Sequence, residues 1–550
     1  MILSMAQFGL VLLSIVAFVL ILGAIIIIHE GGHFFFAKRA GILCHEFSIG
    51  MGPVIYKKQF GETAFCLRAI PIGGFVSMAG EDVADDMIKP GNTIGVNVED
   101  DVITEIILDD NRDCFLRGEV ESLDLKGIGD DPLFITINDG FQSHYYTVKR
   151  DAFYVFEKNK RLQITPYDRT FDSKSLWNRF LTIFAGPMMN LILAMFIYII
   201  VAMATGVPNL GSNQVGSIQG HFPSDGVLEV NDKITHVNGV ETATWEDFSR
   251  ELDKIYKDNK TTINLTIDRN GEIKEVSMEA ITYIASIGIS NIQAKNMLPI
   301  EVPGFEGVTG LELGNVAVRY KDKEGTLKYG DIITKVKIGA NESVDITSWG
   351  QLAGMFRDLN IADVKFEYYS LKDDSTYELV ELKDCKTIEP YTNEVLNNQR
   401  IEKIQQKLGV SPVYHFDFFG CLGQSFKMFW SDFTLIFRTL KLLIAPSDVR
   451  QVGVKDMSSF VGIFGMIQQY IMAGFLPLLA FTALLSVNIG VMNLLPIPAL
   501  DGGRLMFLLY ELITRRKPSK KVEATLNNVF FILLMIFFLY VTFNDILRLF

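Results

Sequence analysis

Cysteine is scarce in this sequence: the five copies lie far apart, form no C-x-x-C pair and outline no disulfide framework. Basic residues are also in the minority, 51 against 64 acidic ones, and no stretch resembles a basic nucleic-acid surface. We therefore expect no nucleic-acid partner. Solvated acidic faces explain the net charge of -13.

Charged residues are almost absent from four apolar stretches, each long enough to span a bilayer. They run at about Phe8 to Ala37, Phe180 to Val207, within Met457 to Leu500, and Ala524 to Phe543. In a chain of 550 residues with 49% apolar composition, these stretches predict a multi-domain membrane protein. The first stretch lacks the basic start and small-residue cleavage site of a signal peptide and is too long for one, so we expect a retained helix.

Basic clusters predict the orientation of these spans. They follow the first span, precede the second and separate the third from the fourth: Lys38, Arg39, Lys57, Lys58, Lys174, Arg179, Arg515, Arg516, Lys517, Lys520 and Lys521. All of them fall on the cytosolic side if both termini are extracytoplasmic. The segment from Pro208 to about Tyr414 is then external, where Cys385 and Cys421 share the oxidising side and could pair.

The first span ends in an H-E-x-x-H motif, His29-Glu-Gly-Gly-His33, which puts three ionisable side chains at membrane depth. Positions i and i+4 share one helix face, so both imidazoles can reach one zinc ion while Glu30 activates water as general base. If Lys38 and Arg39 mark the cytosolic edge, a rise of ~1.5 Å per residue puts the histidines roughly 8 to 14 Å inside it. The alternative, a chance match to a loose motif, is disfavoured because an unpaired acid is costly at that depth.

A third metal ligand is expected from the third span. A catalytic zinc typically takes three protein ligands and leaves one place for water. Asp501 is the only acidic residue from Met457 to Leu509, and it follows a helix break made by prolines and glycines. We expect Asp501 to be the third ligand; an Asp that caps a helix beginning at Gly502 is the competing interpretation.

The polar region between the first two spans alternates Ser, Thr, Val and aromatic residues, which predicts a mostly β cytosolic domain. Its early part, Phe65 to Met78, is more apolar than a soluble loop needs. Strands cannot lie open to lipid, so we expect this hairpin to pack against the spanning helices beside the metal motif. From Phe416 to Ile444, recurring charges in an apolar stretch favour an amphipathic helix on the outer interface over a fifth span.

The external region carries two similar patterns of strand, turn, strand and helix. The spacing from Asp232 to Trp245 is close to that from Asp331 to Trp349, allowing an insertion. We interpret this as an internal duplication; two unrelated β domains are the alternative.

Several further stretches together carry a family resemblance. They are Phe47 to Pro53, Leu67 to Val76, Lys174 to Arg179, Ala185-Gly-Pro187 with Asn190, and Asn493 to Gly503. With the H-E-x-x-H motif, they make most of the chain resemble the site-2 proteases, which are intramembrane zinc metalloproteases. The resemblance is to the bacterial anti-sigma-factor-cleaving branch with external PDZ domains, and Cys44-His-Glu-Phe47 looks most like Gram-positive members.

The resemblance implies roles for individual residues. His29, His33 and Asp501 would hold Zn²⁺, with Glu30 as the catalytic base; Asn488 and Asn493 would hold the substrate segment; and Gly73 and Gly74 would belong to a membrane-associated β element that pairs with the unwound substrate. The two external domains would be PDZ domains that act as a size filter.

One departure from the family pattern lies inside the motif itself. Gly31 takes the place of a larger apolar residue, next to Gly32. Two glycines in mid-helix cost roughly 1 kcal/mol each relative to Ala, so we expect close backbone approach or local softness there.

The implied function is hydrolysis of peptide bonds within or near transmembrane segments of single-pass membrane proteins, such as anti-sigma factors or signal-peptide remnants. It would take place in the lipid bilayer of a bacterial plasma membrane. Two alternatives remain: a catalytically inactive PDZ membrane scaffold and a metal-ion transporter. The intact motif weighs against the first, and the lack of an inverted repeat weighs against the second.

The expected fold is a polytopic α-helical membrane protein with about four transmembrane helices, a cytosolic β-rich insertion and extracytoplasmic PDZ-like α+β domains. The expected segments are a first transmembrane helix (1–40), a membrane-associated β region (41–80), a cytosolic β-rich insertion (81–172), a second transmembrane helix (173–208), PDZ-like domains (209–292 and 293–392), a linker with the interfacial helix (393–456), a third transmembrane region (457–513), and a basic loop with a fourth transmembrane helix (514–550).

Overall fold

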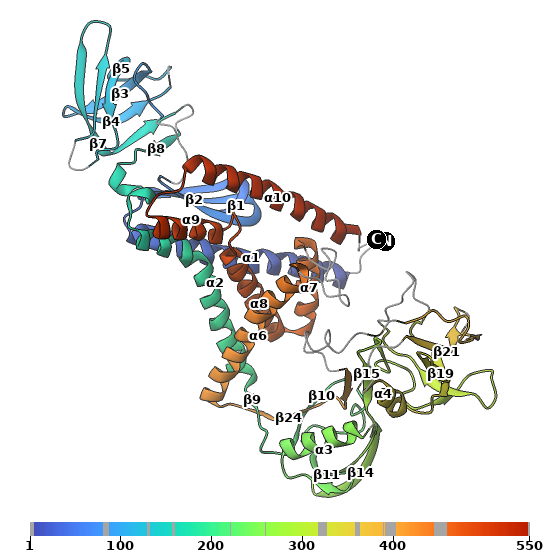
Figure 1. Cartoon of the computed structure of the whole chain (residues 1–550). Coiled ribbons are helices and arrows are strands. Elements are labelled where there is room, and N and C mark those ends of the chain that lie inside the picture. The colour runs from blue at the N-terminus through green and yellow to red at the C-terminus, as the bar shows by residue number, and fades with distance from the viewer. Residues whose placement is uncertain are drawn as a thin grey trace. The chain divides into compact units, whose positions relative to one another are not determined.

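The protein is described from a computed structural model (Figure 1). The described residues are 5–80, 87–109, 111–128, 132–156, 160–220, 222–258, 260–316, 327–357, 363–373, 375–388, 390, 403–444 and 459–547. The chain divides into two units. The first comprises Met1–Ala204, Leu422–Leu440 and Gly453–Phe550, and the second comprises Thr205–Cys421 and Lys441–Val452.

Four helices in the described part of the chain are long and apolar enough to cross a membrane: α1 (Met5–Arg39), α2 (Leu176–Thr205), α8 (Phe475–Leu494) and α10 (Lys520–Leu547). Their number agrees with the four spans expected from the sequence. Helix α6 (Phe418–Ile444) is not among them, as its recurring charges predict. The chain is therefore a membrane protein by the length and composition of its helices.

Helices of the first unit pack against one another through apolar side chains and small residues. Ile25 of α1 is buried against Ile467 of α7 (Phe460–Ala473) and Phe481 of α8. Gly490 of α8 lies against α2, where a Cβ at this glycine would come 3.0 Å from the carbonyl oxygen of Pro187. Small residues at such contacts let two helix backbones approach each other, which is how helices associate in a membrane.

The predicted third transmembrane region, 457–513, contains three helices within its described part rather than one. These are α7, α8 and α9 (Asp501–Thr514). Gly474 separates α7 from α8 with a φ of 114°, a backbone conformation that only glycine adopts readily. The second interruption lies between Leu494 and Asp501, where Pro496 and Pro498 cannot continue a helix.

A β hairpin follows α1, made of β1 (Cys44–Phe60) and β2 (Thr63–Met78). The segment Glu46–Ile49 pairs with Ala64–Leu67 on one side and with Gly74–Ser77 on the other. Among the described strands, no other pairs with Gly74–Ser77, so this segment is an edge. The start of the hairpin packs on the last turns of α1 and on α2, which agrees with the expected position beside the spanning helices.

A separate six-stranded sheet follows the hairpin and confirms a β-rich region between the first two spanning helices. Its order is β4-β3-β5-β6-β7-β8. The strands are β3 (Thr93–Glu99), β4 (Val102–Ile107), β5 (Leu116–Asp124), β6 (Phe134–Asn138), β7 (Ser143–Val155) and β8 (Arg161–Gln163). They enclose their own apolar core, and two short 3-10 helices, Tyr167–Arg169 and Phe171–Ser173, lead to α2.

The second unit contains two sheets with the same order of elements. The first has β11 (Lys233–Val237), β12 (Val240–Glu241), α3 (Trp245–Lys257), β13 (Thr262–Arg269) and β14 (Glu272–Glu279). The second has β19 (Ile332–Ile338), β20 (Val344–Asp345), α4 (Trp349–Arg357), β21 (Val364–Leu371) and β22 (Tyr377–Val380), with β17 (Ile300–Glu301) and β18 (Thr309–Glu312) extending its sheet. Each sheet has its own core around the helix tryptophan.

The same hydrogen bonds recur in both copies. The Asp232 carboxylate accepts from the amide of residue 229, three positions earlier, at 2.8 Å, and the Asp331 carboxylate accepts from residue 328 at 2.9 Å. Thr235 and Thr334 each donate a hydroxyl proton to a carbonyl of the neighbouring strand. Matching contacts at matching positions support the internal duplication over two unrelated β domains.

The remaining strands of the second unit alter the expected domain limits. They are β9 (Val207–Pro208), β10 (Val215–Ile218), β15 (Ile281–Ile284), β16 (Ile289–Ser290), β23 (Ile404–Lys407), β24 (Val410–Pro412) and β25 (Tyr414–His415). Because β23 pairs with β15 and β24 pairs with β10, part of the predicted linker 393–456 belongs to the β structure. The expected boundaries at 80/81, 392/393 and 456/457 adjoin or lie outside the described residues.

The two cysteines that could pair on the external side, Cys385 and Cys421, do not form a disulfide. Both are buried free thiols.

Candidate metal centre

Three side chains that are far apart in the sequence meet at one point of the first unit. His29 Nε2 lies 3.2 Å from Asp501 Oδ2, and His33 Nε2 lies 3.4 Å from the same oxygen. The two Nε2 atoms are 3.3 Å apart. Helix α1 supplies the histidines from adjacent turns of one face, and the first residue of α9 supplies the carboxylate.

The hydrogen bonding of His33 tests whether this group could hold a metal. Its Nδ1 lies 2.8 Å from the carbonyl oxygen of Thr182, which can only accept. Nδ1 therefore carries the proton, and Nε2 presents a lone pair to the centre of the triangle. Ligands bound at ~2.0–2.1 Å to a tetrahedral zinc lie roughly 3.3 Å from one another, which matches the three observed separations. Two imidazoles and one carboxylate thus fit a catalytic zinc site.

Helix α2 makes room for the histidines by carrying a glycine where it faces them. A Cβ at Gly186 would come 2.2 Å from His33 Nε2, so only glycine leaves room for the imidazole. A Cβ at Gly32 of α1 would come 2.5 Å from the carbonyl oxygen of Ala185, whereas one at Gly31 would meet nothing within 4 Å. The close backbone approach expected for the glycine pair therefore occurs at Gly32 alone.

The break between α8 and α9 places Asp501. A Cβ at Gly502 would come 2.1 Å from the carbonyl oxygen of Leu495, so glycine lets the chain fold tightly back on itself. Asn527 of α10 accepts a hydrogen bond from the amide of Ala499 at 3.1 Å and holds the loop. Helix α9 begins at Asp501 after an N-cap residue, Leu500, without a side-chain capping bond. The competing interpretation of Asp501 as a helix cap is therefore wrong.

A cavity of about 570 Å³ opens in front of these side chains. Its polar lining comprises His29, Glu30, His33, Asn493, Asp501 and Arg504. Helix α10 lines it with apolar side chains: Phe531, Leu534, Met535 and Phe538. Of the residues expected to hold substrate, Gly73, Gly74 and Asn493 line the cavity, whereas Asn488 is not among the lining residues.

The edge of the β hairpin lies directly against the expected base. A Cβ at Gly74 would come 2.8 Å from Cγ of Glu30 and 2.7 Å from the carbonyl oxygen of Ser48. Glu30 itself is 7% exposed. Gly74, Phe75 and Val76 of the unpaired edge line the same cavity as Glu30, so a chain laid along this edge would pass beside the carboxylate.

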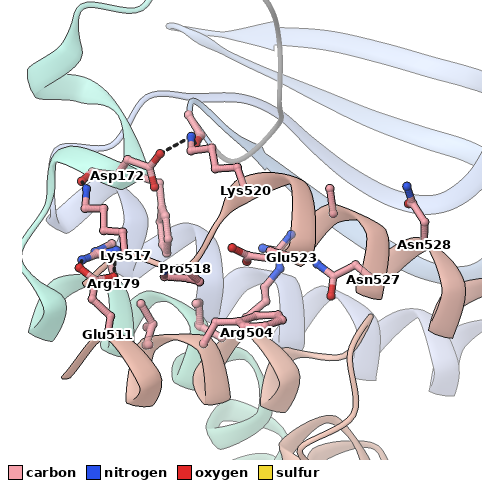
Figure 2. Close-up of a pocket in the computed structure, with 16 residues that line it drawn as sticks. Asp172, Arg179, Arg504, Glu511, Lys517, Pro518, Lys520, Glu523, Asn527 and Asn528 are labelled. Carbon is pink, nitrogen blue, oxygen red and sulfur yellow. Dashed lines mark hydrogen bonds and ion pairs between the residues drawn. The ribbon is translucent and has the colours of Figure 1, made fainter. Parts of the chain in front are cut away.

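A second cavity, of about 370 Å³, has charged residues in its lining (Figure 2). Arg504 and Ile183 line both cavities, so the second adjoins the first. Arg179 of α2 and Glu511 of α9 form a buried two-pronged ion pair there, at 2.7 and 3.0 Å. Figure 2 shows Lys520 of α10 directed toward Asp172, with which it forms an ion pair. These charges make the second cavity a polar space next to a largely apolar one.

The comparison with known proteins agrees with this geometry. The model of peptidase family M50 matches residues 17–537, which is nearly the whole chain. The chain therefore belongs to peptidase family M50, the site-2 protease family, and is a zinc metalloprotease.

Individual relatives cover the full length of the chain. The zinc metalloprotease RasP of Oceanobacillus iheyensis is 30% identical over 545 residues, covering 98% of this chain and 99% of the relative. RasP of Shouchella clausii is 29% identical over 539 residues with the same coverage. A protein of Staphylococcus aureus (strain N315), also named for zinc metalloprotease activity, is 30% identical over 545 residues, again covering 98% and 99%. The names of these relatives specify no substrate and no partner. Membership of a zinc metalloprotease family argues against the two alternative functions, an inactive scaffold and a metal-ion transporter.

No role is predicted from the sequence for Thr182, Gly186 or Asn190 of α2. All three contact the motif histidines: Thr182 through its carbonyl oxygen, Gly186 through its missing side chain, and Asn190 through its amide, 3.2 Å from His29 Nδ1. The signal was present in the Ala185-Gly-Pro187 stretch and in a lone Asn inside an apolar span. A polar residue at membrane depth is a functional candidate by default.

Proposed function

We propose that this chain is an intramembrane protease that cuts single-pass membrane proteins within or near their transmembrane segments, such as anti-sigma factors or signal-peptide remnants. His29, His33 and Asp501 would hold the zinc ion, and Glu30 would be the general base. The observation that carries the proposal is the triangle of Nε2, Nε2 and Oδ2 atoms with sides of 3.2 to 3.4 Å. It lies at the end of a helix that is apolar and long enough to span a bilayer.

The chemistry follows from the positions of these groups. When bound, zinc polarises the scissile carbonyl group and acidifies a water molecule. The carboxylate of Glu30, facing the same cavity, takes the proton from the attacking water and passes it to the nitrogen of the leaving amine. Because Glu30 is buried, its carboxylate is shielded from proton exchange with bulk water, and proton transfer stays inside the cavity.

The substrate has to unwind before it can react, because the hydrogen bonds of a helix shield its peptide bonds. The edge Gly74–Ser77 offers free backbone groups to an extended segment, as in β-strand addition. Gly73, immediately before this edge, has a φ of 69°, a backbone conformation that favours glycine. Asn493 lines the cavity and can bind further backbone groups of the substrate, and Asn488 would act nearby on the same helix.

Water has to reach a cavity with an apolar α10 wall. We assign this route to the second cavity, because Arg504 and Ile183 belong to both walls and its charged lining favours water. It lies among the basic residues that the orientation rule puts on the cytosolic side. Arg504 is the only Lys or Arg side chain that lines the catalytic cavity in the described part of the chain.

The orientation and the external domains complete the proposal. Both termini would be extracytoplasmic in a bacterial plasma membrane, and the duplicated α+β sheets would be PDZ domains that admit only shortened substrates. The repeated strand and helix order supports a duplication that could form such a filter. A reporter enzyme that is active only outside the cytosol, fused to the C-terminus, is expected to be active. An inactive fusion that is still made and inserted would overturn the orientation.

The function is tested by trapping clients with the Glu30→Gln variant. The amide keeps the shape of the side chain but cannot take a proton, so zinc should stay bound while cleavage stops. Proteomics of membranes from cells carrying this variant is expected to show membrane-retained fragments that are absent with the unaltered protein. A variant that retains full cleavage of such fragments would contradict the role of Glu30.

A further inference from the structure

Asn190 joins three helices of the first unit at the metal centre. It lies in α2 with no exposed surface, and its side-chain Nδ2 is 3.2 Å from His29 Nδ1 of α1. Its backbone carbonyl oxygen accepts a hydrogen bond of 2.7 Å from the Ser486 hydroxyl of α8. Both backbone and side chain are thus fixed, and the amide faces His29 from the side opposite to Asp501.

The side-chain oxygen of Asn190 is the unusual part of this arrangement. Oδ1 is buried and has no hydrogen-bond partner among the described residues. Leaving a buried carbonyl oxygen without a donor costs about 1–3 kcal/mol, so such an atom calls for an explanation. Turning the amide by half a rotation exchanges Oδ1 and Nδ2 and places Oδ1 against His29 Nδ1. Nδ2 then takes the place without a partner, so the orientation of the amide is decided by what His29 Nδ1 requires.

The chemistry of a metal-binding imidazole requires such an acceptor. If His29 offers the lone pair of Nε2 toward Asp501 and His33, its proton sits on Nδ1 and needs a partner there. His33 already has one, the Thr182 carbonyl oxygen at 2.8 Å. Asn190 is the group in the equivalent place for His29, and α2 then serves both histidines in the same way.

We propose that Asn190 is a positioning residue of the metal centre: its side-chain carbonyl accepts the Nδ1 proton of His29 and fixes the tautomer and ring orientation that leave Nε2 free for zinc. This inference rests on the proposed metal role of His29. Asn190 touches neither substrate nor zinc, and it acts through the imidazole. Ser486 supports it by holding the backbone carbonyl of the same residue.

The test is the zinc affinity of the purified full-length protein in detergent, measured by competition with a zinc chelator of known affinity. Asn190→Leu keeps the size of the side chain but removes the acceptor, and it should weaken zinc binding roughly 10- to 100-fold. Asn190→Asp keeps an acceptor and should bind zinc at least as tightly as the unaltered protein. His29→Ala should lose zinc binding outright.

These variants separate the two proposals. If Asn190→Leu binds zinc as tightly as the unaltered protein while His29→Ala loses it, the positioning role is wrong and the ligand set stands. If His29→Ala also retains zinc, the proposed metal site is wrong. Should Asn190→Leu fail to fold, Asn190→Asp decides alone, because a folded Asp variant with affinity reduced tenfold or more would overturn the positioning role. Cobalt in place of zinc gives a second readout, since its visible absorption is expected to shift in the Leu variant and not in Gly31→Ala, whose Cβ would meet nothing within 4 Å.

Discussion

Gly186 of α2 lies directly against the imidazole of His33, so closely that a Cβ on this glycine would come 2.2 Å from His33 Nε2. The imidazole of His33, a potential metal ligand, therefore occupies the space that α2 leaves free at Gly186. The metal centre depends on α2 as much as on the two helices that carry the motif residues.

Substituting Gly186 with Ala should therefore displace His33 and strip the protein of zinc. We expect Gly186→Ala to lose most of its zinc and its proteolytic activity, as measured by metal analysis of the purified protein and a cleavage assay. Gly31→Ala is the matched control, because a Cβ there meets nothing within 4 Å. It should keep zinc and gain up to ~1 kcal/mol of helix stability. A Gly186→Ala protein with full zinc content would contradict the packing described for α2.

Gly74 should be essential for a different reason. A Cβ there would press on Cγ of Glu30 at 2.8 Å and on the Ser48 carbonyl oxygen at 2.7 Å. We expect Gly74→Ala to lower turnover at least tenfold while zinc content stays unchanged, because it disturbs the base and the edge strand but none of the three ligand atoms. Ser77→Ala, on the same edge, adds no atom and should remain active. If the two variants were equally active, the hairpin edge would have no role in the mechanism.

The ion pair between Arg179 and Glu511 should be a strong structural link between α2 and α9. Both side chains are largely buried and bond through two contacts of 2.7 and 3.0 Å. Breaking a buried pair leaves an uncompensated charge and costs about 3–5 kcal/mol, whereas replacing both partners by apolar residues is often neutral. Thermal unfolding in detergent should therefore show Glu511→Leu strongly destabilised and Arg179→Met with Glu511→Leu restored. Additive losses in the double variant would show that the two residues act independently.

Acid should weaken the anchoring of the β hairpin. Hydrogen bonds from Arg169, with help from Lys38, lower the pKa of Glu62 at the hairpin turn from an ordinary 4.5 to about 2. Because the folded-state pKa is the lower one, this contribution to stability is present above about pH 4.5 and is lost as the pH falls toward 2. The Glu62 side chain is 25% exposed at the protein surface, so screening by solvent reduces the contribution to roughly 1 kcal/mol. Glu62→Gln should melt below the unaltered protein at pH 7, and the difference should shrink in acid; a constant difference would contradict the assignment.

The meeting of His29, His33 and Asp501 can be expected from the sequence because the signals for it are local or unique. The spacing of His29 and His33 fixes one helix face, and Asp501 is the only acid in its region, so composition and a short motif suffice. Four spanning helices likewise follow from uninterrupted apolar stretches. In both cases one strong physical signal lies in a continuous piece of chain.

Contacts between distant pieces of chain were harder to foresee. Nothing in the local pattern of Gly186 or Asn190 says which imidazole each will face, because this depends on how α1 and α2 pack. The strands at Ile404–Lys407 and Val410–Pro412 lie in the segment predicted to be a linker, and it is their pairing with β15 and β10 that makes them strands. The break between α7 and α8 depends on the single residue Gly474, and the apolar stretch around it gives no sign of a break.

The central claim is that α1 and α9 hold one zinc ion between them. It is tested most directly by the zinc content of the purified chain and of its Asp501→Ala variant, with Arg515→Ala as a control beyond the far end of the same helix. We expect one zinc ion per chain in the unaltered protein and in the control, and almost none in Asp501→Ala. Full zinc content in a folded Asp501→Ala protein would contradict it.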